Sequence, residues 1–524
     1  MPRLPATWRD PALALVLAAA LAACWPFARY VGWLGDEGVL LHGATRMLAG
    51  ELLYRDFFAF LPPAPYLCLE GWLWLFGPTL MAARMLVLAI VAATAGATYR
   101  ACARAGSRAT GIVLALAWVV ASQGAWTVVT HHTMTTLLSL AAGVVVARLV
   151  AEERPAPRLA LWAGALASTA AMVTQTRGAL AVAACAGALL VARRGRRELA
   201  WLALGVAVVP LAIVSWLCAH GTLGDAIAAV LIWPSTNYAP IQRVAFGAFA
   251  TSQTAPAAAL FPVLAVLVLV ARVLGGAAAF KDPRARAWLW FAGAGFVGCF
   301  PRADVVHIAF CAPLALPLFA YSATVVVDAL GDRAAGARAA RFAAWPRRAL
   351  PVLLAAACFP SLLAFSTLLG EARATPRSRS PRGEVALGPA TDPVHTAALL
   401  ARLSTVPASE PIFFYPYDPL LIFLAGRRQV GRYDIFVPNY SRPDEYRSAC
   451  EAAATGAEWF VFDTRWGDPA LLKVVFPSLT QPNPPEKLAL EATLTRAFEP
   501  AATFDPWELR RRRAGATAAG CRPE

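Results

Sequence analysis

The sequence has little charge and few acidic residues. Only 15% of its 524 residues are charged, whereas 58% are hydrophobic, and soluble domains differ from this composition in both respects. It has no CxxC pair, so nothing indicates a zinc or dithiol site. It also has no glycine-rich nucleotide loop and no internal repeat of fixed period. The apolar surplus must therefore face lipid.

Ten cysteines are present, and most lie inside or beside apolar runs. The plainest interpretation of these cysteines is that they are small hydrophobic side chains packed in the core. Only Cys450 and Cys521 fall in the polar C-terminal part. A disulfide between these two is compatible with the sequence, but no spacing rule demands it.

Apolar runs long enough to cross a bilayer recur along the first two thirds of the chain. A membrane-spanning helix needs about 20 apolar residues, and about eleven such runs are found by this criterion. They lie near residues 11–30, 79–99, 109–129, 132–150, 159–175, 178–193, 199–219, 256–275, 287–300, 305–327 and 348–369. The polar break Gln175-Thr176-Arg177-Gly178 separates the fifth run from the sixth.

The basic residues alternate between successive loops. Lys and Arg together number 47 against 32 Asp and Glu, a net charge of +15. The cations gather near Arg3 and Arg9 and in every second loop, at 100–108, 148–158, 193–197, 272–286 and 333–348. Under the positive-inside rule these segments are cytoplasmic. The charge therefore reflects topology rather than nucleic-acid binding, and an odd number of spans places residues 370–524 outside the cytoplasm. We expect a multi-pass protein of a bacterial inner membrane with a cytoplasmic N-terminus.

Two long pieces between and after the spans lie on the outer side. Residues 31–78 form a large first outer loop, whose apolar spacing suggests helices in the membrane interface. The tail opens with a polar linker at 374–383 and then shows strand-like runs at 411–415 and 458–462, with a helical segment at 445–454 between them. The predicted fold is an α-helical polytopic membrane domain over 1–369 and a small soluble α/β domain over 370–524.

The unusual polar residues of the spans collect on that outer side. Ionisable groups at the membrane boundary are costly and usually face a cavity or one another. Their convergence predicts a shared site. The candidates are Asp36, Glu37, Arg55, Asp56, Arg84, His131, His132, Arg177, Asn237, Tyr238, Arg302, Asp304 and His307.

Several of these residues also have a plainer interpretation. Asp36-Glu37 fits a solvated turn, although two acids between glycines favour a functional role. Arg55-Asp56 fits a local ion pair equally well, and Arg84 fits a side chain that reaches the interface. His131-His132 is more typical of a hydrogen-bonded helix start than of a metal site, because spacing supplies no third ligand.

Several motifs between residues 36 and 84 resemble, in their order along the chain, those of a known family. They are Asp36-Glu37-Gly38, residues 50–56, Leu61-Pro62-Pro63-Ala64-Pro65-Tyr66 and Phe76-Gly77 with Arg84. They resemble the first outer loop of GT-C glycosyltransferases, in particular the protein O-mannosyltransferase, aminoarabinose transferase and RgtA/B/C/D-like group. Residues 174–178, 233–238 and Arg302-Ala303-Asp304 with His307 are similar more loosely. Many members carry an acid near the start of the fourth span, where this chain has His131-His132, so the resemblance leaves a second acidic role and metal dependence open.

The resemblance implies inverting transfer of a sugar from a polyprenyl-phosphate donor to an acceptor outside the cytoplasm, whether lipid, glycan or protein. Asp36 matches the position of the family's general base, with Glu37 beside it, and no cofactor is expected. Arginine and histidine suit the phosphate of the leaving lipid. Arg84, Arg177, Arg302 and His307 are the candidates.

Two other functions remain open from the sequence. A transporter or flippase of lipid-linked saccharides would also have many spans and phosphate-binding cations. The absence of repeated halves with broken helices argues against it. A family member that has lost activity and serves as a scaffold is the third reading.

Overall fold

The computed structural model describes residues 10–334, 345–481, 483–515 and 520–521. Arg3 and Arg9 of the predicted cytoplasmic N-terminus lie outside these ranges. The same holds for Arg338 and Arg341 of the predicted inner loop at 333–348.

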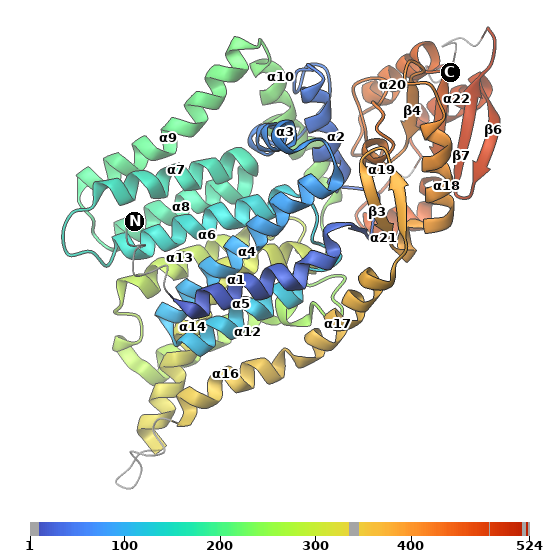
Figure 1. Ribbon diagram of the computed structural model, residues 1–524. Coiled ribbons are helices and arrows are strands. Elements are labelled where there is room, and N and C mark those ends of the chain that lie inside the picture. The colour runs from blue at the N-terminus through green and yellow to red at the C-terminus, as the bar shows by residue number, and fades with distance from the viewer. Residues whose placement is uncertain (1–9, 335–344, 482, 516–519, 522–524) are drawn as a thin grey trace, which may run out of the picture.

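A bundle of helices forms the first two thirds of the chain (Figure 1). Each of the predicted apolar runs overlaps at least one helix, which confirms a mostly helical architecture. The break at Gln175 is real, since one helix ends at Val173 and the next begins at Gln175. The bundle helices are α1 (Pro11–Cys24), α4 (Leu80–Ala105), α5 (Arg108–Ser122), α6 (His131–Leu149), α7 (Pro157–Val173), α8 (Gln175–Val191), α9 (Arg196–Ala219), α12 (Ala255–Gly275), α13 (Pro283–Val297), α14 (Val305–Ala334), α16 (Trp345–Ala357) and α17 (Phe359–Ala374).

The predicted count of about eleven spans is not confirmed. Six helices within the described residues are long and apolar enough to cross a membrane, and a seventh span results if α16 and α17, bent by 44°, count as one. The helices α7, α8 and α13 have 17, 17 and 15 residues. They fall short of the about 20 residues that a bilayer crossing needs.

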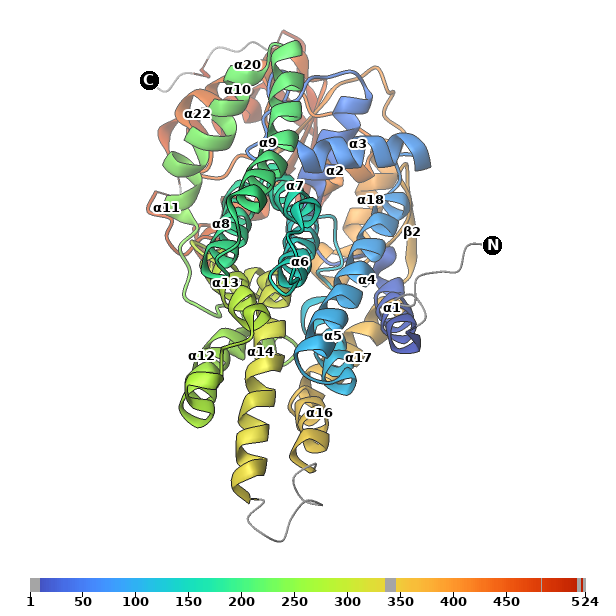
Figure 2. The ribbon, with the colours of Figure 1, turned by 90° about the vertical axis from the view of Figure 1, so that its left-hand side faces the viewer.

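Apolar side chains cover the outer surfaces of the bundle. Helix α9 exposes Leu204, Val208, Leu211 and Val214 at spacings of three and four residues, which places them on one face. An exposed apolar face of this length is suited to lipid. Figure 2 shows α9 at the margin of the bundle, with α10 (Leu223–Ile227) leading away from its end.

The first outer loop contains two helices. They are α2 (Glu37–Leu48) and α3 (Ala64–Phe76). Helix α2 is buried against the tail, whereas α3 ends in exposed Trp74, Leu75 and Phe76. That exposed end fits a helix at the membrane surface.

The tail contains two small sheets. The first sheet also includes one strand from outside the tail, β1 (Tyr30–Val31). Strand β1 is parallel to β3 (Gly383–Leu387), and β2 (Arg377–Ser380) is antiparallel to β3. The second has the order β4-β5-β7-β6, from β4 (Ile412–Tyr415), β5 (Trp459–Asp463), β7 (Trp507–Arg512) and β6 (Phe498–Phe504). Strands β4 and β5 are parallel and the other pairs antiparallel. The prediction of a linker at 374–383 is wrong in part, because residues 377–380 of this segment form β2, which pairs with β3.

Helices and one disulfide complete the tail. The helices are α18 (Pro393–Ser404), α19 (Pro419–Leu424), α20 (Pro443–Gly456), α21 (Pro469–Val475) and α22 (Pro485–Ala497). Cys450 in α20 is bonded to Cys521, so the pairing that the sequence left open is present. Figure 1 shows the tail at the end of the bundle beside α2. One hydrophobic core runs from the bundle helices into α18, α19 and the tail strands, which fixes the tail against the first outer loop.

Candidate active site

Asp36 lies at the first turn of α2, where the outer loop meets the tail. Its side chain is exposed and does not cap the helix. It instead accepts a hydrogen bond from the Tyr417 hydroxyl, just after β4. Beside it, the Leu420 amide donates to the Leu34 carbonyl over 3.0 Å. A Cβ on Gly38 would meet the Leu420 nitrogen at 1.9 Å, so only glycine permits this approach of α19 to α2.

Glu37, the next residue, points into the protein. Its carboxylate receives both Nε and Nη2 of Arg84 at 2.5 Å, and the Val129 amide donates to it over 2.9 Å. Arg84 also donates to the carbonyls of Phe27 and Thr127. Glu37 and Arg84 therefore satisfy each other in a buried space, and neither has a free group for substrate.

A second group of predicted residues meets at the N-terminal ends of α6 and α8. Arg177 donates through Nη1 to His132 Nδ1 over 3.0 Å and through Nε to the Gly298 carbonyl over 3.0 Å. No other hydrogen bond to Arg177 is found within the described residues, so its Nη2 is open. The His131 ring lies 3.8 Å from that of His132, and its Nδ1 bonds the Thr174 hydroxyl at 2.8 Å.

The third group forms around the turn before α14. Asp304 bonds Arg302 Nε at 2.7 Å with one oxygen and His307 Nδ1 at 2.7 Å with the other. Burial raises the pKa of Asp304, but the hydrogen bond and charge of His307 and the charge of Arg302 outweigh it and lower the pKa to about 2. The remaining donors of Arg302 reach Gln242 at 2.8 Å and the Val475 carbonyl of the tail at 3.1 Å.

These two polar groups touch, and Tyr238 interacts electrostatically with charged members of both. The ring of His307 is 4.8 Å from that of His132. Burial, followed by the charge of Asp36, raises the pKa of Tyr238 to about 12, while Arg302 and Arg177 oppose the shift. Tyr238 thus lies within electrostatic reach of the acid and of both arginines. It belongs to a π-helical turn, Pro234–Tyr238, a geometry frequent at functional sites.

Asn237, Arg55 and Asp56 form hydrogen bonds with their chain neighbours. Asn237 accepts a hydrogen bond from neighbouring Thr236 over 2.7 Å. Arg55 and Asp56 form the local ion pair that was the plainer interpretation, with two bonds of 2.8 Å and Arg55 56% exposed. The structure therefore gathers His131, His132, Arg177, Arg302, Asp304 and His307 through direct contacts, whereas Arg55 and Asp56 bond to each other.

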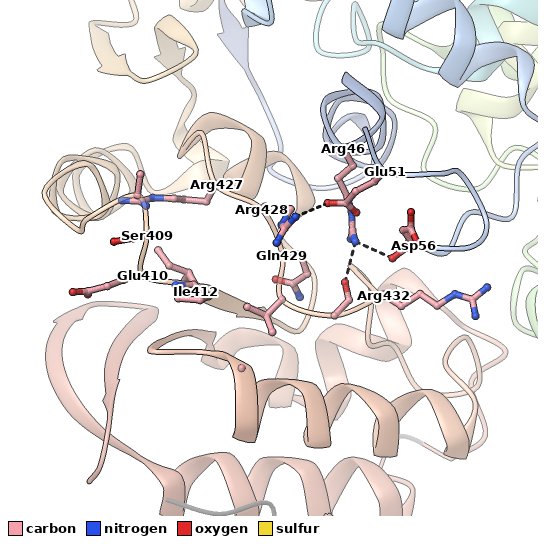
Figure 3. A pocket seen from close by; sticks show the side chains of 15 residues that line it. Arg46, Glu51, Asp56, Ser409, Glu410, Ile412, Arg427, Arg428, Gln429 and Arg432 are labelled. Carbon is pink, nitrogen blue, oxygen red and sulfur yellow. Dashed lines mark hydrogen bonds and ion pairs between the residues drawn. The ribbon is translucent and has the colours of Figure 1, made fainter. Parts of the chain in front are cut away.

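Asp56 lines a cavity of about 670 Å³ between the first outer loop and the tail (Figure 3). The cavity lies near the C-terminal end of α2, whereas Asp36 lies at the other end. Its arginines already bind protein groups: Arg46 and Arg428 pair with Glu51, and Arg427 donates to carbonyls of the tail. The cavity is therefore not the centre that the polar residues form.

Sequence reasoning missed the contributions of the tail, above all Tyr417 and the Val475 carbonyl. Tyr417 directly follows a strand, a position where functional side chains are common, and this was the available signal. A main-chain carbonyl such as that of Val475 leaves no signal in a sequence. Within the described ranges, no three or more His, Cys, Asp or Glu side chains are arranged to hold a metal ion.

Comparison with known proteins gives similarity at the level of structure. No protein-family model matches the sequence, and no curated protein sequence does. ArnT from Cupriavidus metallidurans, solved with undecaprenyl phosphate, superposes with a TM-score of 0.59 at 15% identity, over 98% of this chain and 99% of that one. The Archaeoglobus fulgidus oligosaccharyltransferase, tethered to an acceptor peptide, gives 0.52 at 11% identity over 93% and 72%.

The mycobacterial arabinofuranosyltransferase AftD gives a TM-score of 0.51 at 15% identity, over 98% of this chain and 40% of the AftD chain. All three are GT-C glycosyltransferases. Identities this low show a shared fold and nothing finer. The chain has the GT-C fold over nearly its whole length, as the resemblance of its first outer loop implied.

Proposed function

We propose that this protein transfers a sugar from a polyprenyl-phosphate donor to a hydroxyl of an extracytoplasmic lipid, glycan or protein acceptor, with inversion at the sugar. The observation that carries the proposal is the exposed carboxylate of Asp36, whose charge acts on Tyr238 together with the charges of Arg302 and Arg177. The fold shared with three glycosyltransferases supports it, one of them solved with undecaprenyl phosphate.

Asp36 is the general base in this proposal. A hydroxyl is a weak nucleophile until a carboxylate accepts its proton. The acceptor oxygen then bonds the anomeric carbon as the bond from that carbon to the phosphate oxygen breaks. Attack and departure occur on opposite faces, so the configuration inverts. Glu37 beside it is occupied by Arg84 and serves the structure of the loop.

Arg177 and His132 are best placed to receive the departing phosphate. A guanidinium can only donate hydrogen bonds, so His132 Nδ1 accepts from Arg177 and the ring proton of neutral His132 is on Nε2. The open Nη2 of Arg177 and this Nε2–H supply two donors to an anion. His307 adjoins them, while Arg302 is held by Asp304, Gln242 and the tail. Charge-assisted hydrogen bonds of this kind stabilise a leaving phosphate.

The topology proposed with this function places the tail outside a bacterial inner membrane and the N-terminus in the cytoplasm. The Cys450–Cys521 disulfide supports the outward tail, because disulfides persist in oxidising compartments. The donor arrives within the bilayer, and a polyprenyl phosphate needs no nucleotide pocket.

Mass spectrometry of surface glycans and glycolipids, from cells with and without the protein, tests this function. Asp36→Asn keeps the size of the side chain but removes the base, so the product should fall about 10²- to 10⁴-fold at matched protein level. Asp444→Asn, an exposed tail carboxylate away from the site, is the matched control and should retain the product. A transporter would tolerate Asp36→Asn, so an unchanged product in that variant contradicts the enzymatic role.

A further inference from the structure

The tail places a phenol on the carboxylate that the proposed chemistry uses. Tyr417 lies between β4 and α19, and its hydroxyl donates to Asp36 Oδ1. Its side chain is only 7% exposed, and its ring packs edge-on against Trp466 at 5.1 Å. The phenol therefore reaches Asp36 from a fixed ring rather than from a mobile side chain.

The backbone around this contact is fixed as well. The Leu420 amide bonds the Leu34 carbonyl, two residues before Asp36, and Gly38 lies directly against the start of α19. The shared hydrophobic core continues through Leu420 and Leu421 of α19 into Leu40 and Leu41 of α2. Tyr417 and Asp36 thus belong to one packed unit, although one comes from the tail and the other from the first outer loop.

We propose that Tyr417 is a positioning residue, which holds one oxygen of Asp36 so that the other faces the acceptor hydroxyl. This inference rests on the proposed function. An exposed carboxylate at a helix start rotates freely unless something holds it, and misplacement by about 1 Å can lower a rate about 10²-fold. With Oδ1 engaged by the phenol, Oδ2 is the oxygen left to accept a proton.

The phenol stays protonated in this environment, as a donor must. Burial raises the pKa of Tyr417 well above its usual value, and the charge of Asp36 raises it further. Tyr440 and Tyr238 raise the pKa of this phenol as well. The hydrogen bond therefore persists throughout the physiological pH range.

The test compares Tyr417→Phe with Tyr440→Phe in the full-length protein. Both remove one hydroxyl from the same aromatic cluster and keep the ring, but the Tyr440 hydroxyl has no hydrogen-bond partner among the residues that the structure describes. Transfer would be followed in membranes of cells that make the product, as a function of pH, with thermal unfolding and undecaprenyl phosphate binding measured on the purified variants.

We expect Tyr417→Phe to slow transfer about 10- to 100-fold while leaving undecaprenyl phosphate binding and thermal unfolding unchanged. The low-pH limb of its rate profile should move to higher pH, because a donated hydrogen bond favours an ionised carboxylate. Tyr440→Phe should match wild type in all measurements.

Two results would overturn the positioning role. One is a Tyr417→Phe rate equal to or above wild type, which would make the contact neutral or inhibitory. The other is a slower rate with an unmoved pH profile and lower thermal stability, which would make it merely structural. If Asp36→Asn retains full activity in the same assay, the proposed function of the loop itself fails, and that outcome is distinct from a failure at Tyr417 alone.

Discussion

Glu37 and Arg84 form a bidentate ion pair at 2.5 Å in a space where their side chains are 4% and 1% exposed. The pair joins the start of α2 to the first turns of α4. A buried pair with both partners hydrogen-bonded specifies how two elements meet, and removing one partner leaves an unpaired buried charge. The Glu37–Arg84 pair therefore serves the architecture of the loop, and the neighbouring Asp36 is not part of it.

Replacing one member of this pair should destabilise the protein. Arg84→Met leaves Glu37 charged and unpaired, and we expect a loss of about 3–5 kcal/mol of unfolding free energy. The double variant Glu37→Gln/Arg84→Met should recover part of that loss, because it removes both charges. Thermal unfolding in detergent measures both effects. Arg55→Ala, which breaks an exposed pair with Asp56, is the control and should unfold with wild type. Equal stability of Arg84→Met and Arg55→Ala would refute this role.

The two arginines of the site should differ in their effect on donor binding. Arg177→Ala removes a cation with an open nitrogen, and loss of a charged hydrogen bond of about 1.5–3 kcal/mol corresponds to about 10- to 100-fold weaker binding of undecaprenyl phosphate. Arg302→Ala should lower thermal stability more than affinity, because Arg302 is tied to Asp304, Gln242 and Val475. Binding isotherms and melting curves of both variants decide between them. A larger affinity loss for Arg302→Ala would reverse the assignment.

Topology has a direct test in reporter fusions. Fusions after residue 380 should report an extracytoplasmic location and fusions within 193–197 a cytoplasmic one. In the intact protein, Cys450 and Cys521 should resist alkylation until a reductant is added. A cytoplasmic report from the tail, with both thiols free, would invert the membrane orientation and remove the proposed site.

The tail should lose stability as the pH rises. Burial raises the pKa of Glu445, at the start of α20, to about 7 from a usual 4.5. Since the folded-state pKa lies above the unfolded one, the stabilisation from the neutral form is complete below pH 4.5 and is lost as the pH rises through 7. Glu445→Gln should flatten the fall in melting temperature between about pH 5 and pH 8. Glu451→Gln, an exposed acid of the same helix, should follow wild type, and an equal slope in all three proteins would contradict the prediction.

The helices of the bundle could be predicted because each is encoded by a continuous apolar run in the sequence. Apolar runs and alternating arginines located every bundle helix, including the break at Gln175. The number of spans was not predictable, since α7, α8 and α13 are apolar but short. The pairing of β1 with β3 could not be predicted either, because β1 has only two residues and its partner strand begins at Gly383, far away in the sequence.

The site was predictable where its partners are close in sequence. Asp304 and His307 are three residues apart at a helix start, and the structure joins them directly. The sequence did not show that Asp36 and Glu37 have different partners. Adjacent residues at a helix start point in different directions, so the orientation of the first turn decides which side chain bonds Arg84 and which bonds Tyr417. Contacts that depend on the folded tail leave no trace in the pattern of the first loop.

The parallel pairing of Tyr30 and Val31 with Ala386 and Leu387 joins two segments that the ribosome makes at very different times. The ribosome delivers the segment next to Asp36 early, but its strand partner emerges only after the bundle has been inserted. A nascent or prematurely terminated chain thus contains Asp36 but not Tyr417, which donates the hydrogen bond to it. A chain that ends before residue 383 can therefore form neither the β1–β3 pairing nor the hydrogen bond between Tyr417 and Asp36.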